Sequence, residues 1–455
     1  MKTILQFVAA AMLVLFSSCA DADYVNAIPD GCTALLSVDM AQTAKESNLG
    51  AKANVMMSLL KVSDPGDCGI DFSQKFYLFE SPDGNLGMVA KVSSEKKLGQ
   101  WLGKLSGSQQ AEAVREHRGF RFSVINGAWM VGFSGKAVMV MGPIVAAQQT
   151  ATMAQMAKYL SQDEDGGIKG TPIFEKLDSL DGGMNMVARV RALPDKVAPL
   201  FMIGAPKDAD DSQVVISARM KVADGRLHVE GEPFSFNKTV NAAIKQNWQT
   251  FRPIGQNFLH GGPGQMKLWL NVDGNKFLPL LQQNKSLQSV LAGINMAIDM
   301  DNIIRSIDGD MLLSIDNVAH EMPDLGMVAS LRNTNFLKDV SYWKQSCPQG
   351  SRIDDWSGPA PGSSYVFVSG RTHYYFGAFR HQHPLFFSGN SEAQARQLAS
   401  LPASPAQKTA GVEGKRFAFS MDFQSIDNEA LSIISQLLEP LFGKLTSIVY
   451  TVDKE

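Results

Sequence analysis

The feature that most limits how this chain can fold is a pair of short motifs that occurs twice in the same order. Leu-Ser-Val-Asp at residues 36–39 returns as Leu-Asn-Val-Asp at residues 270–273. Each copy is followed by Gly-Met-Val-Ala, at residues 87–90 and again at residues 326–329. The common order of the two motifs predicts one structural unit that is used twice.

The segments around these motifs predict the same order of elements in both halves. An apolar run at residues 34–38 is typical of a buried strand, and the apolar residues that follow recur at helical spacing. Two strands around the turn signal at residues 81–85 and an amphipathic helix over residues 98–105 come next. Phe-Ser-Gly at residues 133–135 and at 387–389 is a third candidate correspondence between the halves.

The order strand, helix, strand, strand, helix, strand is the ferredoxin-like order, extended here by further strands. We therefore expect an α+β protein made of two tandem copies of this unit, with antiparallel sheets and helices packed on one face. Two prolines and four glycines at residues 252–264 mark a break between helical and strand signals. The predicted repeats are residues 28–255 and 256–455.

The first residues of the chain are typical of an export signal rather than of a folded element. Lys2 precedes an apolar run at residues 4–16, and two serines stand directly before Cys19. This is the three-part layout of a signal peptide, and the run is too short to span a bilayer. We assign residues 1–18 to the signal and exclude them from the fold.

A cysteine placed directly after two small residues resembles the lipobox of bacterial lipoproteins, although Phe16 stands where leucine is commoner. The resemblance implies cleavage before Cys19, acylation of its thiol and a lipidated tether over residues 19–27. Asp21 and Asp23 form an acidic patch in this tether. The patch resembles the export tag of Bacteroidota surface lipoproteins, and a solvated tether explains it equally well.

Charge and hydropathy name no partner for the rest of the chain. The 455 residues carry a formal charge of −3, which becomes −4 once Lys2 is removed with the signal. With no long basic run, the sequence disfavours nucleic acid and a polybasic lipid contact. No later apolar run approaches the roughly 20 residues needed to cross a membrane, so we expect the membrane contact to be made by the N-terminal lipid.

Three cysteines remain once Cys19 is acylated, an odd number for an oxidising compartment. Cys32 and Cys68 both precede predicted strands of the first half, and the second half has no cysteine at either corresponding place. We predict a disulfide between Cys32 and Cys68 with Cys347 free. Three buried thiols are an equally consistent alternative, because free cysteine is often a core residue.

Asp39 and Asp273 are the carboxylates tied to the repeated motif, and each stands where a strand gives way to a helix. Metal binding and acid–base catalysis are the functional interpretations of such a pair. We favour helix N-caps, in which an aspartate oxygen accepts hydrogen bonds from free backbone N–H groups of the first turn. Replacement by alanine is then expected to cost roughly 0.5–2 kcal/mol of stability.

Two other groups suggest metal sites only weakly. His381 and His383 lie near His373 in one predicted hairpin, and we interpret them as a polar hairpin tip because a third ligand is not recognisable. The aspartates of residues 299–310 lack the glycine and the closing glutamate of a calcium loop. We predict no metal, no cofactor and no catalytic residue, since the common nucleotide-binding, hydrolase and metalloprotease motifs do not occur.

Tyr-Val-Asn-Ala-Ile-Pro at residues 24–29, the two repeated motifs and the lipobox together resemble a Bacteroidota family of large lipoproteins whose domain is of unknown function. The resemblance implies an outer-membrane lipoprotein, on the periplasmic or the cell-surface face, with no established activity. Our leading hypothesis is a non-enzymatic binding or scaffold module with a protein or glycan partner. A hydrolase assembled from scattered residues is the alternative, and a purely structural lipoprotein is the third.

Overall fold

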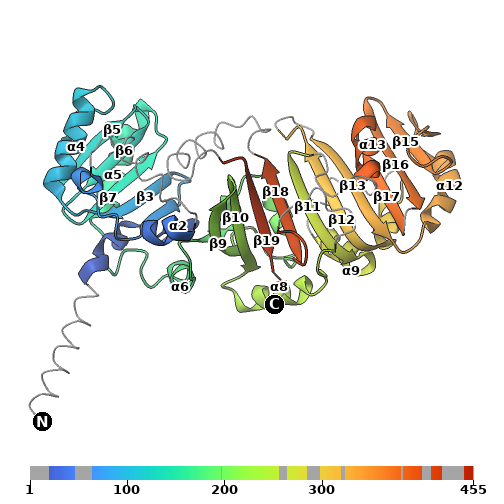
Figure 1. Cartoon of the computed structure of the whole chain (residues 1–455), viewed down its shortest axis with the longest axis horizontal. Helices are drawn as coiled ribbons and strands as arrows, with labels where there is room; N and C mark the ends of the chain where they lie inside the picture. Colours follow the sequence, from blue (N-terminus) through green and yellow to red (C-terminus); the bar gives the residue numbers. More distant parts are fainter. Residues whose placement is uncertain are drawn as a thin grey trace, which may run out of the picture. The chain divides into compact units, whose positions relative to one another are not determined.

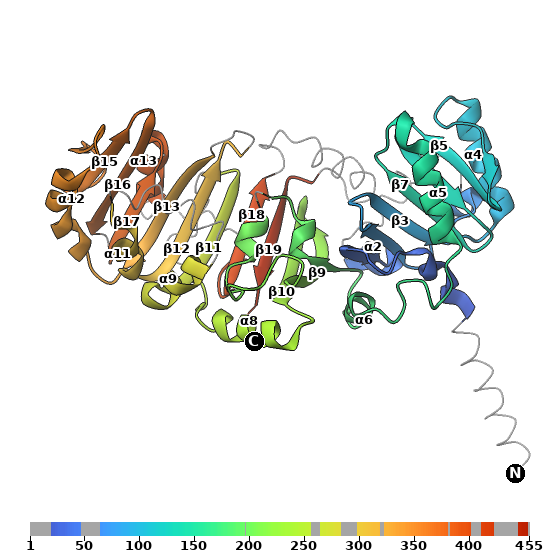
Figure 2. The same cartoon turned by 180° about the vertical axis from the view of Figure 1, so that it is seen from behind.

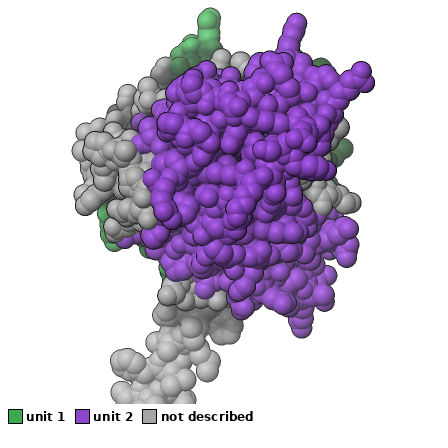
Figure 3. Space-filling view, turned by 90° about the vertical axis from the view of Figure 1, so that its right-hand side faces the viewer, with its two compact units in different colours: residues 1–192, 217–221, 440–442 green, residues 193–216, 222–439, 443–455 purple. Residues whose placement is uncertain are grey.

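The computed structural model describes residues 20–46, 64–195, 197–255, 264–283, 298–318, 323–380, 383–401, 411–422 and 445–453. The chain forms two compact units, which Figure 3 colours separately. Unit 1 comprises residues 1–192, 217–221 and 440–442, and unit 2 comprises residues 193–216, 222–439 and 443–455. The division predicted between residues 255 and 256 falls inside unit 2.

The strands belong to one sheet rather than to two ferredoxin-like sheets. The described residues hold 19 strands in a single mixed sheet, together with ten α-helices. The sheet is mixed because β10 (Arg226–Phe234) and β19 (Ser447–Val452) pair in parallel. The predicted fold of two tandem ferredoxin-like copies with helices on one face is therefore wrong.

In unit 1, eight strands pair in antiparallel fashion (Figure 1). The order of pairing is β8 (Met184–Arg189), β1 (Ala34–Val38), β2 (Phe76–Glu80), β3 (Leu86–Lys91), β7 (Ala137–Gly142), β6 (Trp129–Phe133), β5 (Phe120–Ile125) and β4 (Arg115–His117). In a split βαβ unit the two strands joined by the first helix run parallel, and a third strand lies between them. Here β1 and β2, on either side of α2 in the chain, pair directly and antiparallel, which excludes the ferredoxin-like arrangement.

The helices of unit 1 follow from local sequence signals. They are η1 (Ala20–Ala27), α2 (Met40–Glu46), η3 (Pro65–Cys68), α4 (Glu95–Gly107), η4 (Ala146–Gln148), α5 (Gln149–Leu160), α6 (Pro172–Asp178) and η5 (Val190–Ala192). Ser94 caps α4 by accepting a hydrogen bond from the backbone N–H of Lys97. Leu98, Leu102 and Leu105 are buried on one side of α4, so the predicted amphipathic helix is confirmed.

Helices cover both faces of the sheet in unit 1, because successive strand residues point to opposite sides. A Cβ on Gly132 of β6 would lie 3.2 Å from Leu160 of α5. The next residue, Phe133, lies under the Arg121 guanidinium at 5.9 Å. Arg121 in turn pairs with Glu95 of α4 at 3.4 Å. Thus α5 and α4 pack on opposite faces, contrary to the predicted single helical layer.

Unit 2 repeats this order of strand pairing and adds to it, as Figure 2 shows from behind. Strands β10 and β19 are followed in the pairing order by β18 (Phe417–Asp422), β11 (Met266–Asp273), β12 (Ile307–Asp316), β13 (Asp324–Leu331), β17 (Pro384–Gly389), β16 (Thr372–Arg380), β15 (Ser364–Ser369) and β14 (Ser351–Asp355). A further strand, β9 (Val215–Ala223), is divided between the units, because residues 217–221 belong to unit 1. The eight strands from β18 to β14 thus pair in the same order as the eight strands from β8 to β4.

The helices of unit 2 also lie on both faces of the strands. They are α7 (Ala198–Phe201), α8 (Lys238–Trp248), α9 (Gly274–Gln283), α11 (Met300–Arg305), η6 (Asn335–Asp339), α12 (Val340–Ser346) and α13 (Glu392–Ser400). Phe376 of β16 packs against Trp343 of α12, with ring centroids 6.3 Å apart. The preceding Tyr375 is paired with Gly389, whose Cβ would lie 2.9 Å from the backbone nitrogen of Ala395 in α13. Neighbouring residues of β16 therefore face different helices.

The Gly-Met-Val-Ala motif takes equal places in the two pairing orders, whereas Phe-Ser-Gly does not. Residues 87–90 lie in β3 and residues 326–329 lie in β13, at equal places in the two pairing orders. Phe133 ends β6, whereas Phe387 lies inside β17, which takes the place of β7. The predicted correspondence of the two Phe-Ser-Gly segments is therefore wrong. A match of three common residues is too short to fix which strands correspond.

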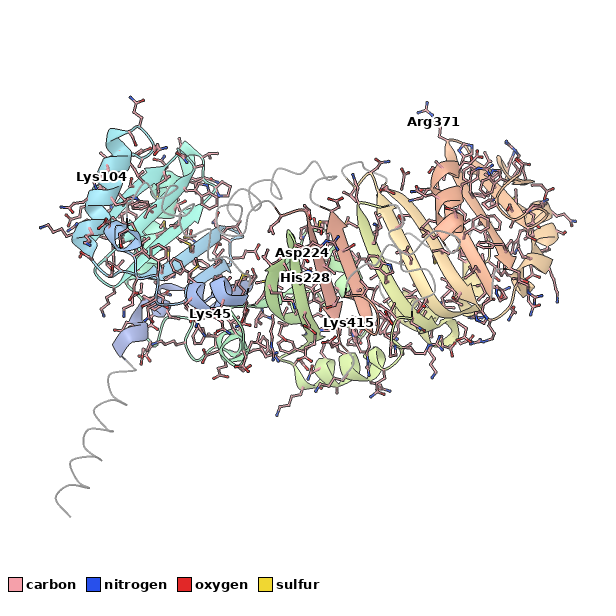
Figure 4. All side chains as sticks on the ribbon, in the orientation of Figure 1. Lys45, Lys104, Asp224, His228, Arg371 and Lys415 are labelled. Atoms are coloured by element: carbon pink, nitrogen blue, oxygen red, sulfur yellow. The ribbon has the colours of Figure 1, made fainter. Side chains whose placement is uncertain are left out.

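An ion-pair cluster closes one end of the strands around β19. Lys415, labelled in Figure 4, pairs with Glu230 of β10 at 3.0 Å and with Asp453, directly after β19. Behind these charges Phe417, Phe201 and Tyr450 form an aromatic core, with the Phe201 and Tyr450 rings 5.0 Å apart. The apolar and β-branched residues at 447–452 favour a strand, and they form β19.

Candidate functional site

The candidate site is a cavity of about 510 Å³ in unit 1, next to the first described residues. Four segments line it: η1, the start of β5, the turn between β6 and β7, and the chain that leaves α5. The lining residues are Asp23, Asn26, Ala27, Phe120, Ser134, Gly135, Lys136, Ala137, Leu160, Ser161, Gln162, Asp163 and Glu164. Its volume lies within the range of small-molecule sites, about 300–1,000 Å³.

The N-terminal wall of the cavity is η1, a segment that we predicted to be a tether. Tyr24, Val25, Asn26 and Ala27 are all at least nine-tenths buried. The Tyr24 hydroxyl donates to the backbone oxygen of Lys75 at 2.8 Å, and the Tyr24 ring packs on Tyr77. Residues 24–27 are therefore part of the folded unit, and Cys19 precedes this wall directly.

Close backbone packing fixes the position of Asn26. A Cβ on Gly167 would lie 2.6 Å from the backbone oxygen of Asn26, so only glycine fits there. Gly167 also forms an isolated β-bridge with Pro29. On the opposite wall, the Ser134 hydroxyl oxygen accepts hydrogen bonds from the backbone N–H groups of Lys136 and Ala137, which fixes the β6–β7 turn.

Two side-chain amides at the cavity have unsatisfied oxygens. Asn26 is 4% exposed, and no donor in the described residues reaches its Oδ1 atom. Gln162 donates from Nε2 to the backbone oxygen of Gly166 at 2.7 Å, while its Oε1 atom likewise has no donor among the described residues. A buried amide oxygen without a donor costs about 1–3 kcal/mol. A buried group without a partner calls for an explanation, and a bound water molecule or ion is one.

Four charged side chains line the cavity: Asp23, Lys136, Asp163 and Glu164. Lys136 contacts Asp23 at 3.4 Å, and their side chains are 76% and 41% exposed. Glu164 pairs with Lys169 at 3.3 Å. Exposed pairs of this kind contribute about 0–1 kcal/mol and are screened by salt. Asp163 is exposed as well, so the lining carries three carboxylates and one lysine.

A second hollow, of about 590 Å³, lies between α4 and the β4–β5 hairpin. Its walls include Gln100, which is exposed, and the ion pair between Glu95 and Arg121. Polar groups that already pair with one another, or that face solvent, give no reason to bind a ligand. We therefore place the candidate site at the N-terminal cavity.

The aspartates of the repeated motif are confirmed as helix caps. Asp39 accepts a hydrogen bond from the backbone N–H of Gln42 at 2.9 Å, in the first turn of α2. Asp273 accepts from the backbone N–H of Asn275 at 3.0 Å, in the first turn of α9. Asp273 also contacts the Arg332 guanidinium at 3.1 Å. Neither aspartate lines the cavity.

The other aspartates that suggested calcium are placed apart from one another. Asp299 caps α11 by accepting from the backbone N–H of Asn302 at 2.9 Å. Asp308 lies between the guanidinium groups of Arg252 and Arg332, at 2.9 and 3.4 Å. Asp310 is buried and accepts hydrogen bonds from the Gly255 N–H and the Asn271 amide. Their oxygens serve capping and ion pairing.

The three remaining cysteines are free thiols in the structure, so the predicted bond between Cys32 and Cys68 is not formed. Both of these side chains are buried. Burial raises the pKa of Cys32 to about 12 and also raises the pKa of Cys68. Thiols of this kind are unreactive at neutral pH, because the thiolate is the nucleophile. Cys19 lies outside the described residues.

The histidines do not form a metal site in the part of the chain that the structure describes. His373 lies in β16 and stacks on Tyr375, with ring centroids 6.3 Å apart. His383 is exposed just before β17, and His381 lies outside the described residues. Among the described residues, no group of three His, Cys, Asp or Glu side chains could hold a metal ion.

The cavity was not predicted from the sequence, although Asn26 lies in the segment quoted above, residues 24–29. The available signal was an asparagine within an apolar run, which becomes a buried polar side chain once that run packs. Gln162 begins an acidic stretch, residues 162–167, whose composition is typical of an exposed connection. The residues come together through the pairing of β5, β6 and β7, which the sequence does not specify.

Comparison with known sequences gives one match. Residues 39–400 match the family described as "Domain of unknown function (DUF4836)". No curated protein and no solved structure matches the chain. Within the described residues, no helix is both long enough and apolar enough to cross a bilayer.

Proposed function

The chain therefore belongs to the DUF4836 family, and on that premise we propose that it is a lipid-anchored binding protein of the bacterial cell envelope. The proposed anchor is an acylated Cys19, and the proposed binding site is the N-terminal cavity. The observation that carries the proposal is the pair of unsatisfied amide oxygens, on Asn26 and Gln162, beside a cavity of ligand size. The family has no known activity that would contradict a binding role.

The position of the cavity supports the anchor. Cys19 follows a signal-like run of residues and directly precedes η1, which is a wall of the cavity. Three residues separate Cys19 from Asp23, and the four steps from one to the other span at most about 14 Å when the chain is fully extended. A lipid on Cys19 would therefore hold the mouth of the cavity close to the headgroups of the membrane.

We extend the proposal to the outer membrane and to a Bacteroidota origin, because of the lipobox-like residues and the acidic patch after Cys19. Cell-surface exposure and the periplasmic face both remain open. We also propose that the two sets of eight strands are tandem repeats, supported by their common pairing order and the repeated motifs. The lining of the cavity contains no histidine or cysteine among the described residues, so we favour binding over hydrolysis.

Membrane fractionation with radiolabelled palmitate tests the anchor. We expect the full chain to be labelled and to sediment with membranes, and Cys19→Ala to lose both properties. Cys347→Ala is the matched control, because it removes a free cysteine elsewhere and should keep the label. Labelling that persists in Cys19→Ala would refute the proposed anchor. Protease treatment of intact cells then distinguishes the surface face from the periplasmic face.

A further inference from the structure

We draw no further inference here: the strongest candidate, the row of half-buried apolar side chains that crosses one face of the strands of unit 1 from β8 to β7 (Met186, Leu36, Leu78, Met88 and Val140), is an apolar face, and nothing in the described residues shows what covers it.

Discussion

Asp39 follows β1 in unit 1 and Asp273 closes β11 in unit 2, and each caps the helix that comes next. Around Asp39 the partners are backbone groups: its N–H donates to the Gly183 oxygen at 2.7 Å, and the Thr43 hydroxyl donates to the same oxygen at 3.0 Å. Around Asp273 the partner is a cation, Arg332, which contacts Asp308 as well.

This difference between Asp39 and Asp273 shows which contacts depend only on residues nearby in the chain. The cap needs only an aspartate before a helix, so both copies form it whatever surrounds them. The second partner comes from a distant strand or loop: Gly183 precedes β8, while Arg332 directly follows β13. The shared Val-Asp at the end of each strand therefore specifies the helix cap. It does not specify the tertiary contact, which differs between the two units. Three experiments test this division.

The largest effect is expected one residue after the two aspartates, where unit 1 has Met40 and unit 2 has Gly274. A Cβ on Gly274 would lie 1.8 Å from the backbone oxygen of Ile304 and 3.0 Å from that of Ile307. Backbone must move to admit it, so Gly274→Ala should destabilise unit 2 by about 3 kcal/mol or more. Met40→Ala is the control and should cost about 1 kcal/mol. Denaturant unfolding followed by hydrogen exchange in α9 and α2 measures both, and equal losses would contradict the comparison.

A smaller difference is expected between the aspartates themselves. Asp39→Ala removes a cap and should cost about 0.5–1 kcal/mol, whereas Asp273→Ala removes a cap and an ion pair and should cost about 1–2 kcal/mol. A double-mutant cycle of Asp273→Ala with Arg332→Met isolates the pair energy. A zero coupling energy, or a larger loss from Asp39→Ala, would show that the cation adds nothing to the cap.

The smallest effect is the pH dependence of unit 2. Burial alone would raise the pKa of Asp273, but the Asn275 N–H and the Arg332 guanidinium outweigh it and hold the pKa below its usual range. Because the folded-state pKa is the lower one, Asp273 stabilises the fold above pH ~3.9, and the contribution is lost as pH falls through the folded pKa. Carboxyl-detected NMR should show this pKa rise in Arg332→Met. An unchanged titration would mean that the cation does not act on Asp273.

The sequence predicted the elements better than their arrangement. The strand ending at Val38, the α4 helix behind Ser94 and the strand at residues 447–452 were found because each has its own local signal. The short strands β4 and β14 were missed, because β4 is a three-residue strand and β14 is mostly polar. The predicted pairing of the strands was wrong. The choice of neighbouring strands depends on contacts across the whole unit, which no local signal contains.

The same limit explains the candidate site. Caps at Asp39 and Asp273 could be predicted, because an N-cap depends on residues next to one another in the chain. The cavity could not, because Asn26, Phe120 and Gln162 meet only after η1, β5 and the end of α5 have packed. Whether a side-chain amide lacks a hydrogen-bond partner depends on how the interior packs. The spacing of residues in the sequence does not predict it.

The place of β19 has a consequence for biosynthesis. Arg226 of β10 pairs with Ser447, and Phe417 of β18 pairs with Val452, so β19 lies between a strand made midway and one made near the end. During synthesis this edge of β10 has no partner until β19 is made, more than two hundred positions later in the chain. Such long-range pairing slows folding and leaves a strand edge exposed meanwhile. The edge of β10 that β19 covers therefore stays unpaired until the last strand has been made.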